Sequence, residues 1–420
     1  VRRHPRESWP GFVTALVEAC GRRQLPERED ANADFVDGTF PTPFANTPEG
    51  RVSSAIGYLD ARARARPNLQ ILAGATATRL LFEGARAVGA EFRRGAASET
   101  ILAAETIVAA GAIHSPALLL RSGIGPAEEL KRLGIAPVID RPAVGRGLQN
   151  HFVVNLATWL APDARQDAAL RTYGVACARI SSKLDGTRPA DIHLQFMAKL
   201  SAYPHGDRLG MVGAALYAPR SRGSVTLASA DPAVPPVVDF RFLSDPLDRV
   251  RMHKAVNLGL DLLEDPAVAP THGEVFIVVP SSLARRLNRP SLRNRILSTA
   301  IAAMLDGPAP LRRFALGQVG RRIDPADRSA EAIDALIEHV MPVFHPTGTC
   351  RMGRTDDPQA VTDANCRVLG LDGLRVVDAS IMPVIPTANT CLPTMMVAEQ
   401  AAARIKAARR EGASRGERVA

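Results

Sequence analysis

The amino-acid sequence predicts an α/β fold of mixed α+β type with two domains, one of which is discontinuous. Its 420 residues are enough for two hydrophobic cores. Short strand-like runs and turns follow residue 67 and return after residue 340, and a stretch that mixes alternating and helical patterns separates them. We therefore expect residues 67–150 and 341–420 to form one domain. Residues 151–340 should form the other, with residues 1–66 packed near it.

The first part of the chain begins with helical and loop patterns and then changes to a period of two. Residues 10–25 predict an amphipathic helix, residues 26–50 a loop, and residues 53–66 a second helix that Pro67 ends. Four strand-like runs joined by turns follow, at residues 69–72, 75–82, 87–92 and 100–109. The last run closes with a nearly continuous apolar stretch, which is typical of a strand buried on both faces.

After this stretch the pattern predicts a helix that starts at Ser115 and has Pro116 at its first position. Residues 122–126 should end it, and another helix is expected at 127–133. Alternating runs predict an antiparallel sheet, at residues 191–198, 210–218, 223–228 and 237–240. The remaining predicted elements are helices at 246–265, 329–340 and from Pro393 to about Arg409, and a strand and turn within 366–378.

Composition and charge exclude several classes of protein. The formal net charge is +9, but arginine pairs are scattered with acids between them, only five of the 52 basic residues are lysine, and aromatic residues make up 5%. A nucleic-acid partner is therefore not predicted, because both a basic stripe and stacking platforms are missing. No run of 18 apolar residues occurs, so no membrane span is predicted.

The five cysteines are widely spaced and form no C-x-x-C pair. This pattern argues against a disulfide framework and favours a reducing compartment, so we expect a cytoplasmic protein. His339, His345 and Cys350 do not have the spacing of a zinc site, and no metal is predicted. No G-x-S-x-G or H-E-x-x-H motif occurs either.

Two stretches near the C-terminus carry the residues suited to chemistry. The first is F-H-P-T-G-T-C-R-M-G and contains His345, whose imidazole has an unperturbed pKa near neutral pH and suits a general base. The second runs through V-V-D-A-S to Asn389, whose amide suits a developing alkoxide or the orientation of His345. A helix that follows Asn389 would place its positive end nearby.

Together these stretches resemble the active-site signature of the glucose–methanol–choline (GMC) oxidoreductases. A further stretch, G-A-I-H-S-P-A-L-L-L-R-S-G-I-G-P, is similar to the internal signature of that family. The resemblance implies an FAD-dependent enzyme that oxidises a primary alcohol by hydride transfer to flavin N5, with His345 as the base and Asn389 beside it. It also implies that the discontinuous domain is a Rossmann-like FAD-binding domain, and that residues 151–340 bind the substrate. The residues carried over to the cofactor are Ala77, Ala110, Gly111, Phe344, Asp378, Ala379, Thr390, Pro393 and Thr394.

One part of the family pattern is absent from the sequence. The pairs Gly123-x-Gly125 and Gly145-x-Gly147 lack both the third glycine and the preceding strand of a dinucleotide fingerprint. We expect the phosphate-binding segment to lie upstream of Val1, so that the chain is roughly the C-terminal three quarters of such an enzyme and its FAD-binding domain is incomplete. On this expectation the chain alone binds FAD weakly or not at all and is inactive.

Two other functions stay open at this point. One is a lyase of the same fold that keeps flavin without redox turnover, and the other is a non-catalytic remnant. The substrate expected is a small primary alcohol, with choline-like molecules as the next choice. The choice between oxygen and a quinone as electron acceptor, the identity of the alcohol and the oligomeric state are not readable from the sequence.

Overall fold

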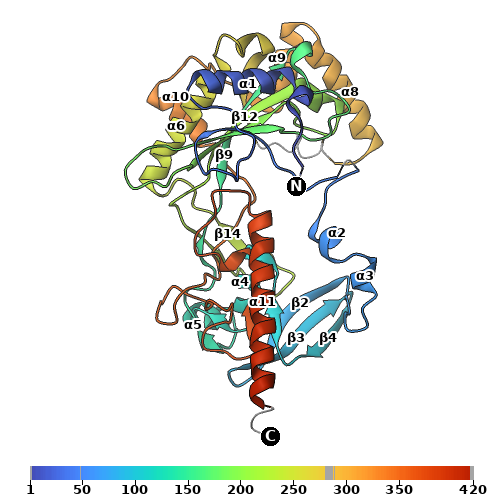
Figure 1. The fold of residues 1–420 in the computed structure, drawn as a ribbon, viewed down its shortest axis with the longest axis vertical. Helices are drawn as coiled ribbons and strands as arrows, with labels where there is room; N and C mark the ends of the chain where they lie inside the picture. Colours follow the sequence, from blue (N-terminus) through green and yellow to red (C-terminus); the bar gives the residue numbers. More distant parts are fainter. Residues whose placement is uncertain (1, 48, 280–286, 288, 417–420) are drawn as a thin grey trace. The chain divides into compact units, whose positions relative to one another are not determined.

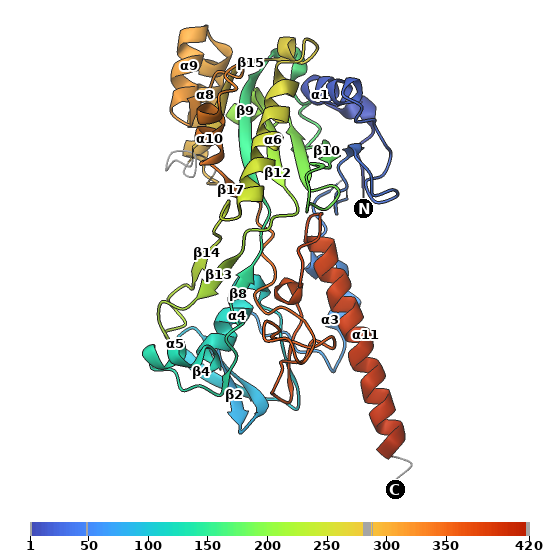
Figure 2. The same cartoon turned by 90° about the vertical axis from the view of Figure 1, so that its left-hand side faces the viewer.

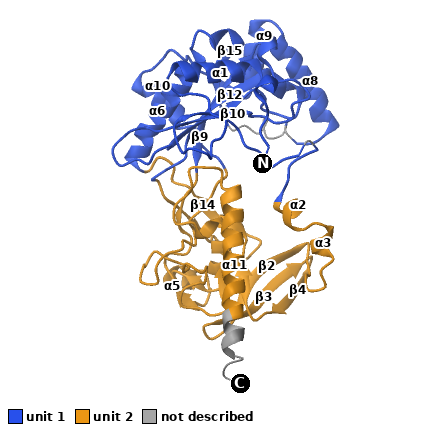
Figure 3. Ribbon diagram, in the orientation of Figure 1, with its two compact units in different colours: residues 1–53, 151–220, 245–343 blue, residues 54–150, 221–244, 344–420 orange. Residues whose placement is uncertain are grey.

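The computed structural model describes residues 2–47, 49–279, 287 and 289–416, with side chains as far as residue 410 (Figure 1). The chain forms two compact units (Figure 3): unit 1 contains residues 1–53, 151–220 and 245–343, and unit 2 contains residues 54–150, 221–244 and 344–420. The boundaries of these units differ from those expected for the domains. Residues 221–244 belong to unit 2 because their strands β13 (Gly223–Thr226) and β14 (Val237–Asp239) form one sheet with β8 (Arg146–Leu148).

Unit 1 is built on an antiparallel sheet with the strand order β1-β10-β11-β12-β9-β15-β16, and β17 also pairs with β9. Its strands are β1 (Gly38–Pro41), β9 (Phe152–Leu160), β10 (Ala176–Ile180), β11 (Ile192–Met197), β12 (Leu209–Leu216), β15 (His272–Val278), β16 (Gly320–Arg322) and β17 (Met341–Pro342). Its helices are α1 (Gly11–Arg22), α6 (Pro246–Leu263), α8 (Leu292–Asp306), α9 (Ala309–Gly317) and α10 (Ala330–Ile337), with 3-10 turns η1 (Arg6–Ser8), η2 (Pro162–Ala164), η3 (Pro204–Arg208) and η4 (Ala269–Thr271).

The core of unit 1 lies where α6 covers strand β12 (Figure 2). All eight residues of β12 are buried, which agrees with their apolar and small side chains. Gly259 of α6 permits the close approach, since a Cβ there would lie 2.9 Å from Leu156 Cδ1. The helix begins at Asp245, whose side chain caps the backbone N–H of Leu247.

Unit 2 contains four small sheets: β2-β3-β4, β14-β13-β8, and the parallel pairs β5–β18 and β6–β7. Its strands are β2 (Ala75–Glu83), β3 (Arg86–Arg94), β4 (Ala97–Leu102), β5 (Thr106–Val108), β6 (Ile124–Gly125), β7 (Ile139–Asp140), β8 (Arg146–Leu148), β13 (Gly223–Thr226), β14 (Val237–Asp239) and β18 (Leu374–Val376). Its helices are α2 (Ser54–Tyr58), α3 (Ala61–Arg64), α4 (Gly111–Arg121), α5 (Ala127–Arg132) and α11 (Cys391–Gly416), with the 3-10 turn η5 (Ala379–Ile381).

The mixed α/β class is confirmed, with several local corrections. Of the four runs expected in an antiparallel sheet, 191–198 and 210–218 contain β11 and β12 of the unit 1 sheet, but 223–228 and 237–240 contain β13 and β14, which belong to a separate sheet with β8 in unit 2. The predicted loop at 26–50 contains β1, residues 69–72 form no strand, and the predicted helix at 53–66 is divided into α2 and α3. Ile107 of β5 is 47% exposed, so the expectation of a strand buried on both faces was wrong. Among the described residues β18 is the only strand that pairs with β5.

Helix α4 begins at Gly111 and contains Pro116 in its interior, so the predicted start at Ser115 was wrong. Proline has no N–H, and the carbonyl of Ala112, four residues earlier, therefore receives no helix hydrogen bond from it. The hydroxyl of Thr349 donates to this carbonyl over 2.7 Å. This contact replaces the missing donor and ties the first C-terminal signature to α4.

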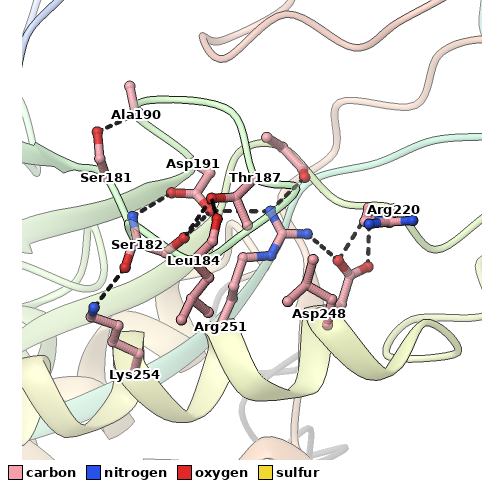
Figure 4. Close-up of polar contacts among 12 residues, drawn as sticks. Ser181, Ser182, Leu184, Thr187, Ala190, Asp191, Arg220, Asp248, Arg251 and Lys254 are labelled. Atoms are coloured by element: carbon pink, nitrogen blue, oxygen red, sulfur yellow. Dashed lines mark hydrogen bonds and ion pairs between the residues drawn. The ribbon is translucent and has the colours of Figure 1, made fainter.

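A group of charged side chains is buried in unit 1 (Figure 4). Arg251 of α6 pairs with both Asp191 and Asp248, and the side chains of all three are at most 1% exposed. Asp191 also accepts hydrogen bonds from the backbone and hydroxyl of Ser182, and both oxygens of Asp248 accept from the backbone N–H of Arg220. We call these three charged residues the Arg251 cluster.

No helix within the described part of the chain is both long enough and apolar enough to span a bilayer.

Candidate functional site

All of the predicted site residues lie in unit 2 (Figure 3). His345 occupies a loop that begins with Phe344, a residue with a φ of +63°. Phe344 is 79% exposed and His345 only 9%, so the turn directs the first side chain outward and the second inward. The backbone N–H of His345 donates to Asn150 Oδ1 over 2.8 Å.

The segment after His345 is held against the residues that follow β8. Thr347 and Gln149 exchange two backbone hydrogen bonds, of 2.9 and 3.0 Å. Gly348 has a φ of +86°, and a Cβ at this position would lie 2.7 Å from Gln149 Nε2 and 2.9 Å from the carbonyl oxygen of Gly147. Glycine is therefore required here by both the dihedral angle and the close packing.

The two signature stretches lie side by side. Gly348, Cys350 and Met352 donate backbone hydrogen bonds to the carbonyls of Ala379, Ser380 and Ile381. The side chain of Gln149, which is 2% exposed, extends this connection, because its Nε2 donates to the carbonyl of Pro383 and its Oε1 accepts from the N–H of Ile385. The loop of His345 and the segment that leads to Asn389 are thus joined through one buried amide.

Burial lowers the pKa of His345 to about 4. The imidazole is therefore neutral near pH 7, which is the protonation state that a general base needs before it takes a proton. Its low pKa has a cost, since a weaker base accepts a proton less readily. A negatively charged group bound beside the ring would raise the pKa again.

Two buried polar atoms next to this histidine have no hydrogen-bond partner among the described residues, Asn150 Nδ2 and Thr347 Oγ1. Both side chains are nearly inaccessible to solvent, at 4% and 0%. A buried donor without an acceptor costs roughly 1–3 kcal/mol. Such atoms fit a bound molecule that supplies the missing partner, and they lie within the loop system that carries His345.

The N-terminus of α4 surrounds the carboxylate of Asp378. Its Oδ2 accepts from the N–H of Gly111 over 2.8 Å and from the hydroxyl of Ser115 over 2.5 Å, and its Oδ1 accepts from the N–H of Ser380 over 2.7 Å. Asp378 therefore joins the second signature to α4 and places a negative charge at the helix end where it is favoured. Gly111 has a φ of +81° and open space where a Cβ would stand.

Asn389 and the start of α11 form another part of the site. Asn389 is exposed, Thr390 is 9% exposed, and the helix begins at Cys391, so that Pro393 is its third residue and not its first. Thr394 donates both its N–H and its hydroxyl to the carbonyl of Thr390. The unpaired N–H groups of this first turn give a positive helix end beside Asn389.

The remaining predicted residues present small side chains or backbone at the surface of unit 2. Ala77 of β2 and Ala110 at the end of β5 are exposed, and Ala379 is half-buried within η5. The N–H of Ala110 donates to the hydroxyl of Ser115. The assignment of Ala77 and Ala110 to the cofactor stays a prediction.

Gln149 and Asn150 were missed as site residues in the sequence. Both follow the Gly145-x-Gly147 pair, but their amide side chains have no evident chemistry of their own, and only the fold shows that they hold His345 and the segment before Asn389. His151, the next residue, is fully buried and stacks on Tyr217 with ring centroids 4.1 Å apart.

Comparisons with known proteins show the family of the chain. Two family models described as GMC oxidoreductase match the chain, over residues 1–153 and 219–398. A 5-(hydroxymethyl)furfural oxidase of Methylovorus sp. (strain MP688) is 38% identical over 94% of this chain and 68% of its own length. An oxygen-dependent choline dehydrogenase of Burkholderia thailandensis is 34% identical over 93% of this chain and 66% of its own length. The chain thus spans about two thirds of the length of these relatives.

Solved structures of other proteins have a fold similar to that of this chain. A pyridoxine 4-oxidase from Mesorbium loti aligns with a TM-score of 0.75 and 26% identity, over 96% of this chain and 71% of the other. A formate oxidase of Aspergillus oryzae aligns with a TM-score of 0.76 over 97% and 72%, and at 21% identity it supports the fold alone.

Proposed function

The chain belongs to the GMC oxidoreductase family, and on this premise we propose that it carries the catalytic residues of an enzyme that oxidises the CH–OH group of a primary alcohol. The family membership confirms the resemblance found in the sequence and shows an oxidoreductase. FAD is the cofactor that this family membership implies. The base, the substrate and the remaining site residues are the proposed part.

The observation that carries the proposal is the buried, neutral imidazole of His345 in a loop fixed by Asn150 and Gln149. When bound, FAD supplies the acceptor for a hydride, at flavin N5. His345 takes the hydroxyl proton of the alcohol, so that the oxygen lone pair can form the carbonyl as the hydride leaves the carbon. A fixed loop holds the ring in one orientation toward that proton.

Asn389 and α11 assist this step electrostatically. The Asn389 amide donates to the alcohol oxygen as negative charge develops on it, and the positive end of α11 favours negative charge in the same region. Asn150 Nδ2 and the hydroxyl of Thr347, for which the described residues offer no partner, are further donors near His345. This set of donors fits a substrate with an oxygen at its reacting carbon.

Unit 2 also offers residues that suit the cofactor. Gly111, with its open space, and the small residues Ala77 and Ala110 leave room for an adenine or ribose, while Asp378 holds the start of α4 in place for them. Asp378 acts in this proposal mainly through the hydrogen bonds that it accepts, which already occupy both of its oxygens. Phe344, Ala379, Thr390, Pro393 and Thr394 complete the proposed cofactor side.

The substrate class is proposed from the relatives. The names of the similar proteins refer to 5-(hydroxymethyl)furfural, choline and pyridoxine, each of which carries a primary alcohol. We propose a small primary alcohol of the hydroxymethyl-arene type, with choline-like alcohols as the alternative. The higher identity to the furfural oxidase favours the first class.

The test is reduction of bound flavin by alcohols in the absence of oxygen. The chain is first titrated with FAD by quenching of flavin fluorescence, and is then mixed anaerobically with 5-(hydroxymethyl)furfural, pyridoxine, choline and benzyl alcohol. Where the titration shows bound FAD, loss of the visible absorbance of oxidised flavin with one of these alcohols is the expected result. Bound flavin that no alcohol reduces, together with cleavage of a cyanohydrin, would establish a lyase, and absence of FAD binding would agree with the weak binding expected from the sequence.

A further inference from the structure

Most of the positive charge of the chain lies in one segment of unit 1. Nine arginines and a single acidic residue, Asp306, occur between residues 285 and 322, so this segment of 38 residues carries +8 of the formal net charge of +9. Arginine pairs are scattered along the whole sequence and are elsewhere accompanied by acidic residues. In this segment Asp306 is the single acidic residue. Asp306 itself is engaged by Arg165 and Arg208, which lie outside the segment.

The same segment contains α8, whose outward face is apolar. Asn294, Ser298, Ala302 and Leu305 are the buried side of the helix, whereas Leu292 is 75% exposed and Ile296 64% exposed. At about 100° per residue, Leu292 and Ile296 lie within about 40° of each other on the side opposite the buried residues. A surface helix normally places polar residues on this side.

Arg293 and Arg295 flank the apolar stripe, one on each side of it by the same geometry. Both are exposed, and no ion pair is found for either of them among the described residues. Arg312 and Arg313 of α9, in contrast, are paired with Glu274. The cationic groups beside the stripe are therefore available to an external anion.

Helix α9 also exposes large apolar side chains. It follows α8 after two residues and packs against it, and both helices lie at the edge of unit 1 (Figures 1 and 2). Phe314 is 63% exposed and Leu311 42% exposed. We use the name α8–α9 face for the exposed residues Leu292, Ile296, Leu311, Phe314, Arg293 and Arg295 of these two packed helices.

We propose that the α8–α9 face binds the surface of an anionic lipid bilayer. A helix with large apolar side chains on one side and arginines along both margins lies in the interface of such a bilayer, with the apolar groups among the acyl chains and the guanidinium groups at the phosphates. Charge complementarity and the exposed apolar side chains favour an anionic bilayer over the two other possible partners. A second copy of the chain would bring Arg293 and Arg295 against the same two cationic residues, and a nucleic acid would gain nothing from Leu292, Ile296 and Phe314.

The experiment is sedimentation of the full chain with vesicles of phosphatidylcholine alone and of phosphatidylcholine mixed with phosphatidylglycerol. Binding to the mixed vesicles is expected to exceed binding to the neutral ones and to decrease with salt. The R293Q/R295Q variant should bind the mixed vesicles about 30-fold more weakly, since each arginine at an anionic surface contributes roughly fivefold. The L292S/I296S variant should lose at least about tenfold.

The serine variant separates the proposal from adsorption by charge alone, which would leave its binding unchanged. Two matched controls, V250S on the exposed side of α6 and R62Q/R66Q in unit 2, remove an apolar group or two charges elsewhere and should bind like the parent. Equal binding by L292S/I296S, equal loss in the controls, or no binding to either vesicle would overturn the proposal. Light scattering that shows a dimer, reduced to monomer by L292S/I296S, would assign the face to a second copy instead.

Discussion

The His345 loop in unit 2 and the Arg251 cluster in unit 1 are both buried and polar, but their hydrogen bonding differs. In the Arg251 cluster both carboxylates are paired with the guanidinium and also accept hydrogen bonds from the surrounding chain, and only Nε of Arg251 has no hydrogen-bond partner among the described residues. Around His345, Asn150 Nδ2 and Thr347 Oγ1 have no partner within the described residues, and burial lowers the pKa of the imidazole to about 4.

This difference indicates that the Arg251 cluster stabilises the fold, whereas the polar groups around His345 are available to a ligand. A nearly satisfied ionic cluster gains nothing from a further molecule, and its role is to connect α6 to the chain around Asp191 and Arg220. Donors that remain unpaired in a buried site weaken the fold and are expected where binding makes up the deficit. Burial alone does not distinguish the two regions, because the polar side chains of both are buried.

The largest expected effect is on chemistry. Replacing His345 by glutamine should lower the rate of anaerobic flavin reduction by alcohol roughly 10²- to 10⁴-fold, because that is the usual contribution of a general base. His339→Gln, a change at the end of α10, is the control and should leave the rate unchanged. An H345Q variant that reduces flavin at the parent rate would remove His345 from the proposed role.

The second effect is on folding. Arg251→Met leaves Asp191 and Asp248 buried without their cation, and the free energy of unfolding should fall by about 3–5 kcal/mol in urea titrations. Arg249→Met, on the same helix, breaks only an exposed pair with Asp334 and should cost less than about 1 kcal/mol. Equal losses in the two variants would show that the buried cluster has no special part in stability.

The third effect is the pH dependence of stability. The pKa of His345 falls from 6.5 in the unfolded chain to about 4 in the folded one, so the unfolded chain binds more protons between these values. The free energy of unfolding is therefore highest above pH 6.5 as far as this group is concerned. It decreases by on the order of 3 kcal/mol as the pH falls from 6.5 to about 4. Denaturation of the parent and of H345Q across this range measures it, since all other titrating groups are common to both. Parallel curves would contradict the lowered pKa.

The smallest effect concerns the contact between Thr349 and α4. Thr349→Val removes the donor to the carbonyl of Ala112 and should cost about 1–3 kcal/mol of stability. Pro116→Ala restores an N–H four residues after Ala112, so the double variant T349V/P116A should be more stable than T349V. A double-mutant cycle by thermal or urea unfolding measures the coupling, and additive effects would show that the hydroxyl does not replace the missing donor.

Local sequence patterns predicted most helices and strands. The errors occur where contacts with residues far away in the sequence determine the local structure. The sequence favoured Pro116 as the first residue of a helix, but a hydroxyl at position 349 allows it to lie in the interior. Residues 38–41 looked like loop because their strand character depends on pairing with β10, more than 130 residues later. Ile107 was expected to be buried, but among the described strands β5 pairs with β18 alone.

The sequence supplied the chemical groups of the proposed site but not the framework that holds them. The motifs identified His345 and Asn389, since an imidazole and an amide at those places have an evident use. Gln149 and Asn150 have no such use, and their value depends on geometry that no pattern contains. The uneven distribution of arginine was readable from the sequence, but its meaning required the exposed side of α8.

The division of the chain into interleaved segments has a consequence for biosynthesis. Unit 1 needs residues 1–53 together with a last segment that ends at residue 343, and unit 2 receives its signature residues from 344 onward. Strand β1 must wait for β10, and β5 must wait for β18, while the ribosome adds more than a hundred residues in each case. Apolar surfaces of the nascent polypeptide therefore stay exposed for many seconds at usual elongation rates. Chaperones that bind exposed apolar segments would have long-lived binding sites on it.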